Sequence, residues 1–382
     1  MARSWLPKLL AIAALPLLLG LSAATPSSPS YHFTRKAASN SETVAGWMVE
    51  NAVAKAYQAV TGTPATVEGA VDYFSVTGRP AAGLASHPLE LEALEPGVEL
   101  LIQQQVGEAL VGQGLGLRVL GADLLFPPVL FRFEAPPKLL VVSPRERIER
   151  LSTVLLRPEI SLADAEGLEE AVSRDGFSAL VTPIGGLGIY PSMVPKGSEV
   201  GWTLRTVAHE WAHQFFALRP LGWKYALGAE GDEQMVVVNE TAAEILGREV
   251  GDEVYRRYYR GRVPEQPRPA SQQDSFRAFM REVRRMVDSL LADGKVDEAE
   301  SFMESARQSL EQEGYQLRKL NQAYFAFHGS YSDEMPVGGA VGDDIGDRLR
   351  RLRAASPSVG EFVWRISSAG SYDEFLRVTT AP

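Results

Sequence analysis

Apolar residues recur at helical spacing through the first part of the chain beyond residue 43. Two stretches, 43–60 and 96–114, have this pattern, and the second begins at a proline, which favours the first turn of a helix. The pattern therefore predicts a mostly helical N-terminal region over residues 44–125.

After this region, helical spacing gives way to short apolar runs. Two short apolar runs, 129–133 and 138–142, are bounded by prolines and are typical of strands. A helix opened by Ser161 follows, and then a strand from residue 177. After a Gly-Gly break, the pattern of residues 187–190 predicts a second strand that ends at Pro191. A proline at this position suits the edge of a sheet.

Beyond Gly201 almost every segment has helical spacing, and the predicted helices end at Pro220, Gly251, Gly294, Gly314 and Gly329. The chain is therefore predicted to be an α+β protein, with a small mixed sheet that has an edge strand and is followed by a mostly helical region. We expect residues 126–382 to form this domain.

The N-terminus carries a different pattern. Residues 9–24 are uncharged and apolar, Arg3 and Lys8 precede them, and small residues end the run. This is typical of a secretory signal cleaved after Ala24, or of an N-terminal membrane anchor over residues 5–24. In both cases we expect the body to be extracytoplasmic, joined to this segment by a Ser/Pro-rich linker over residues 25–43.

Net charge and the lack of cysteine limit the ligands and metal sites that the chain can have. The chain has 382 residues and a formal net charge of −10, which argues against a nucleic-acid-binding surface. It has no cysteine, so any metal ion must be held by His, Asp or Glu. Composition does not fix the oligomeric state.

The most specific motif is the His-Glu-x-x-His of residues 209–213. Positions four apart share a helix face, so His209 and His213 can bind one ion, and their imidazoles suit Zn²⁺. Glu210 is rotated by about 100° from His209 and can act as general base toward a metal-activated water.

A third ligand must come from elsewhere in the chain. Glu240 and Glu244 lie four apart on a predicted helix, so one can ligate while the other orients a ligand histidine. Glu233, with the neighbouring acids Glu230 and Asp232, is the alternative, but it lies in a predicted loop. Helical context favours Glu240.

His-Glu-x-x-His followed by Asn239-Glu240 resembles the gluzincin metallopeptidases, and in particular exported bacterial proteins labelled aminopeptidases. The resemblance covers about residues 180–331 and implies a zincin-like domain with Glu240 as the third zinc ligand and Glu244 supporting a ligand histidine. The Gly-x-Met-x-Asn motif that binds a free substrate amine in aminopeptidases is absent, so endo- and exopeptidase activity stay open.

The resemblance also implies a donor that stabilises the oxyanion, downstream of the glutamate ligand, and an edge strand that pairs with an extended peptide. His328 is the first choice for the donor and Tyr331 the second. The expected substrate-binding residues are Gly186, Leu187, Gly188 and Ile189.

We therefore expect an exported zinc-dependent peptidase that acts on peptides or proteins. The alternative is a non-catalytic envelope binding or assembly protein, stabilised by zinc on the same scaffold. Glu210 favours the enzyme, because a purely structural metal site has no use for a base.

Overall fold

The computed structural model describes residues 29–77, 88–119, 121–226, 233–263, 270–328 and 340–380. The predicted signal or anchor and Tyr331 lie outside these ranges. Within them, no helix is both long enough and apolar enough to cross a membrane.

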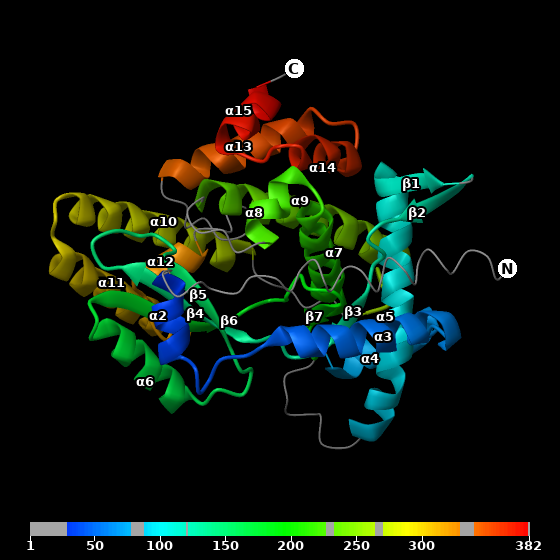
Figure 1. The fold of residues 1–382 in the computed structure, drawn as a ribbon, viewed down its shortest axis with the longest axis horizontal. Coiled ribbons are helices and arrows are strands. Elements are labelled where there is room, and N and C mark those ends of the chain that lie inside the picture. The colour runs from blue at the N-terminus through cyan, green and yellow to red at the C-terminus, as the bar shows by residue number, and fades with distance from the viewer. Residues whose placement is uncertain are drawn as a thin grey trace.

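Figure 1 shows a mostly helical molecule with three small sheets, one of which projects at its edge. Strands β5 (Ser152–Leu156), β4 (Lys138–Pro144) and β6 (Phe177–Pro183) form an antiparallel sheet in that order. The other sheets are the parallel pair β3 (Phe131–Phe133) and β7 (Ser192–Val194), and the antiparallel pair β1 (Gly116–Val119) and β2 (Ala122–Leu125). The predicted α+β class is confirmed, with the parallel and antiparallel pairings in separate sheets.

The three-stranded sheet is covered by helices on both faces, because its strands are apolar at successive positions. Val141 and Leu180 face a cluster with residues of α10 (Ala270–Ala292), α11 (Val296–Gln312) and α12 (Gln322–His328). Leu140 and Val142 face the opposite cluster, with residues of α2 (Pro29–Lys36) and α6 (Leu162–Ser173).

Helix α2 departs from the sequence-based expectation. It lies within the predicted linker 25–43, yet Phe33 is buried between the sheet and α6. A single large apolar side chain in a Ser/Pro-rich stretch gave too little periodicity to predict this packing.

A second, larger core surrounds α7 (Val200–Ala217), which lies near the centre of the molecule in Figure 1. Helix α9 (Glu233–Tyr258) packs along α7. The remaining elements are α3 (Val44–Thr61), α4 (Val67–Thr77), α5 (Pro88–Leu110), η3 (Val111–Leu115), α8 (Pro220–Ala226), α13 (Ala340–Ala354), α14 (Val359–Ser367) and α15 (Tyr372–Thr380).

The predicted edge strand 187–190 is wrong. Only Leu187 pairs, through backbone hydrogen bonds of 3.1 and 3.2 Å with Met193, and the true strand is β7. Tyr190 is fully buried, so the chain turns inward there instead of continuing as an open edge. The hairpin β1–β2, within the region expected to be helical, follows Gly114, whose φ of 86° ends the helical run.

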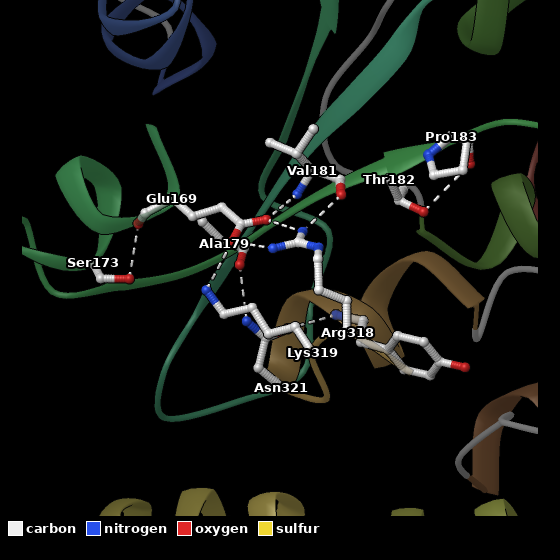
Figure 2. A network of polar contacts seen from close by, with 10 residues as sticks. Glu169, Ser173, Ala179, Val181, Thr182, Pro183, Arg318, Lys319 and Asn321 are labelled. Carbon is white, nitrogen blue, oxygen red and sulfur yellow. Dashed lines mark hydrogen bonds and ion pairs between the residues drawn. The ribbon is translucent and has the colours of Figure 1, made fainter. Parts of the chain in front are cut away.

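A buried ionic network covers the free edge of β6 (Figure 2). Glu169 of α6 accepts hydrogen bonds from the backbone N–H of Val181 at 2.6 Å and from both terminal nitrogens of Arg318. Arg318 also donates to the carbonyl of Val181, and Asn321 donates to that of Ala179. Edge groups that would otherwise stay unpaired are thereby satisfied.

The charge on Glu169 depends on the same partners. Burial alone would raise its pKa, but the hydrogen bonds from Arg318 and Val181 and the charge of Lys319 outweigh burial and hold the pKa below its ordinary value. The ionised network therefore stabilises the fold above the ordinary carboxyl pKa, and this contribution is lost as pH falls through the lowered one.

Candidate metal centre

Helix α7 places two imidazoles beside each other. His209 and His213 are one turn apart on one face of α7, and their Nε2 atoms lie 3.0 Å apart. Their rings meet edge to face, with centroids 4.7 Å apart. Both point out of α7 toward α9, which packs against it.

Helix α9 supplies the third group. Oε2 of Glu240 lies 3.6 Å from Nε2 of His209 and 3.4 Å from Nε2 of His213. These three side chains form a group that could hold a metal ion, and it is the one such group found among the described residues. The predicted convergence of two histidines and Glu240 is therefore present in the structure.

The far side of each imidazole meets a polar group from α9. Nδ1 of His213 lies 2.8 Å from Oδ1 of Asn239, and Nδ1 of His209 lies 3.4 Å from Oε2 of Glu244. A proton on Nδ1 facing these oxygens leaves the Nε2 lone pair free for a cation. The predicted supporting position of Glu244 is the one observed, whereas the contact of Asn239 was not predicted.

Glu240 is a buried anion. It is 3% exposed, and burial alone would raise its pKa, but His213 and His209, when protonated in the metal-free site, hold the pKa well below its ordinary range. A carboxylate that stays ionised in the interior, with two imidazole nitrogens beside it, is a suitable donor set for a divalent cation.

Glu210 is also buried, at 6% exposed, and burial raises the pKa of its carboxyl group. Gly186 and Gly188 lie directly against it. A Cβ on Gly186 would come within 2.2 Å of Oε1 of Glu210, and one on Gly188 within 2.8 Å of Cβ of His213. Only glycine allows the backbone to approach these side chains so closely.

Gln214, which follows His213 on α7, holds the backbone segment around Gly186 and Gly188 in place. Its amide nitrogen donates to the carbonyl of Ile189 and, at 2.7 Å, to the hydroxyl of Ser192. The predicted substrate-binding residues 186–189 therefore lie beside Glu210 and His213, although they form no strand. Sequence alone gave no sign of this clamp, because a glutamine on an apolar helix face has no distinctive spacing.

Other predicted site residues are not brought together with this group. His328 ends α12, which packs on β4 and β6, and its ring lies 4.2 Å from that of Tyr324 between centroids. Burial lowers its pKa to about 4. Among described residues no contact joins His328 to the histidine–glutamate group. Tyr331, Glu230, Asp232 and the side chain of Glu233 lie outside the described part of the chain.

Two glycines of α9 explain how α7 and α9 come so close. A Cβ on Gly247 would lie 2.8 Å from the carbonyl oxygen of Arg205 and 2.9 Å from Cβ of His209, and one on Gly251 would lie 2.6 Å from the nitrogen of Arg205. Gly251, predicted to end this helix, is instead a packing position, and α9 continues to Tyr258. The close approach brings Glu240 to the histidines.

Replacing Asn239 by alanine tests the support of His213. The substitution removes the oxygen that faces Nδ1 of His213, so we expect metal affinity to fall by about 10- to 100-fold. Titration with a divalent metal against a competing chelator measures this. The control Asn40→Ala removes an amide whose oxygen accepts a hydrogen bond from Arg157 and which has no contact with His213, so it leaves the affinity unchanged. Equal affinity of Asn239→Ala and wild type would contradict the assigned role.

Comparisons with known proteins add no relative: no family model, curated protein or solved structure matches the chain. The interpretation of this centre therefore depends on its own residues.

Proposed function

We propose that the protein is a zinc-dependent peptidase, with zinc held by His209, His213 and Glu240. The observation that carries this proposal is the triangle of 3.0, 3.4 and 3.6 Å between their donor atoms. Zinc–ligand bonds of about 2.0 to 2.2 Å at tetrahedral angles separate donors by about 3.3 to 3.6 Å. Three protein donors leave a fourth position, as in catalytic zinc sites.

Zinc would supply a Lewis acid that polarises a peptide carbonyl and lowers the pKa of a nearby water. Glu210 is the residue suited to move protons, because it follows His209 on α7 and its carboxyl pKa is raised by burial. It takes a proton from the attacking water and gives it to the departing amine. The segment 186–189, held by Gln214, forms one wall beside Glu210, with Gly186 and Gly188 against the side chains of Glu210 and His213.

Metal removal tests the proposal. We expect the purified full chain to bind one zinc ion and to cleave an unfolded protein substrate. A chelator should abolish cleavage, and zinc should restore it where magnesium does not, because hard magnesium prefers oxygen ligands.

Two other results would argue against this proposal in different ways. Stoichiometric zinc with no cleavage of any peptide library would favour the alternative, a non-catalytic zinc-stabilised binding or assembly protein. Lack of zinc binding by the folded protein would remove the basis of both.

A further inference from the structure

The outward face of α3 is apolar along its whole length. Val49, Val53, Tyr57 and Val60 recur at spacings of four, four and three, so they form one stripe. Val53 and Tyr57 are 68% and 71% exposed. The complete exposed face consists of Ala45, Gly46, Val49, Glu50, Val53, Ala54, Tyr57, Val60 and Thr61, in which Glu50 is the only charged residue.

The opposite face of α3 fixes this orientation. Lys55, the only cation of the helix, is buried in an ion pair with Glu99 of α5. Ala52 and Ala56 pack against Leu130 and Tyr190. The apolar stripe is therefore held outward, and the helix cannot hide it by turning about its axis.

An exposed apolar stripe of this kind indicates a surface that binds another apolar surface, of protein or of lipid. A second copy of the chain is a poor occupant, because a stable interface needs about 20 to 30 residues from each partner and this face offers nine. A lipid surface fits better, because a helix lying in the plane of a bilayer buries one apolar stripe among the acyl chains and headgroups.

The sequence before the described residues supports a lipid surface. The uncharged apolar run of residues 9–24 follows Arg3 and Lys8 and is long enough to enter a bilayer. Four residues separate this run from Pro29, where α2 begins, and the five residue steps from Ala24 to Pro29 span at most about 18 Å. A chain attached by this run keeps the start of its folded body within that distance of the membrane.

We propose that residues 9–24 are retained as a membrane anchor and that the exposed face of α3 lies in the interface of that lipid bilayer. Apolar contact, not charge, provides the affinity, since this face presents no cation. The inner face of α3 touches Tyr190, which follows the segment beside Glu210, so α3 packs next to the segment that borders the candidate metal centre. This proposal does not depend on peptidase activity.

The natural absence of cysteine makes the test direct. Val53→Cys and, as a control, Ser305→Cys on the exposed face of α11 each place one thiol for an environment-sensitive fluorophore. The full chain is reconstituted in phosphatidylcholine vesicles with and without bromine on the acyl chains. We expect bromine to quench the label at 53 and shift its emission to shorter wavelength, and to leave the label at 305 unchanged.

Each other result overturns the proposal. Emission typical of water at both positions means that the face stays in solvent. A label at 53 that is shielded without being quenched means that protein covers the stripe. Rapid oxidation of unlabelled Val53→Cys to a disulfide-linked dimer identifies that protein as a second copy.

Discussion

Glu210→Gln is expected to lower kcat/KM for peptide cleavage by at least about 100-fold while one zinc ion stays bound. General bases typically contribute 10²- to 10⁴-fold, and an amide of the same shape cannot accept the proton. His209, His213 and Glu240 keep their mutual distances, since none of them depends on a hydrogen bond from Glu210. Zinc content and steady-state kinetics on the same preparation measure both quantities.

The stability of this variant separates chemistry from unfolding. Burial raises the pKa of Glu210, so the folded protein disfavours the charged form at neutral pH, and a neutral isostere removes that cost. We expect the metal-free variant to unfold at the same temperature as wild type or at a higher one. Glu170→Gln, a surface change on α6, is the matched control and should leave kcat/KM unchanged. Wild-type cleavage by Glu210→Gln would remove this residue from the mechanism.

The candidate metal-binding group was predictable because it depends on local geometry. One helical turn places His209 beside His213 whatever the rest of the fold does, and the same periodicity gives Glu240 and Glu244 a common face. Of the features that form this group, only the contact between α7 and α9 depends on the tertiary fold. Helical context favours Glu240, since a helix fixes the direction of its side chains, but Glu233, expected in a loop, is instead the first residue of α9.

The failures concern positions where tertiary contacts decide. Pro191 has the pattern of a strand end, but the segment before it is held by Gln214 and buries Tyr190. Gly251 has the pattern of a helix end, but it accommodates the backbone of Arg205. A glycine that ends a helix and a glycine that lets two helices touch look the same in a sequence. Neither partner segment is visible from local spacing.

Gly247→Ala is expected to damage both the fold and the metal centre. The added methyl would lie 2.8 Å from the carbonyl oxygen of Arg205 and 2.9 Å from Cβ of His209, and backbone cannot move aside as a flexible side chain can. Overpacking of this kind typically costs about 1 to 3 kcal/mol. To relieve it, α9 must move away from α7, which takes Glu240 away from His209.

Gly167→Ala is the matched control, because Gly167 is also a helical glycine but a Cβ there would meet nothing within 4 Å. It should stabilise the protein by about 0.5 to 1 kcal/mol, since alanine loses less backbone freedom on folding. The two substitutions thus add the same methyl group with opposite expected signs. Urea unfolding gives both free energies, and a chelator competition gives zinc affinity, which should fall only in Gly247→Ala. If Gly247→Ala binds zinc as tightly as wild type, the close approach of α7 and α9 is not what brings Glu240 to the histidines.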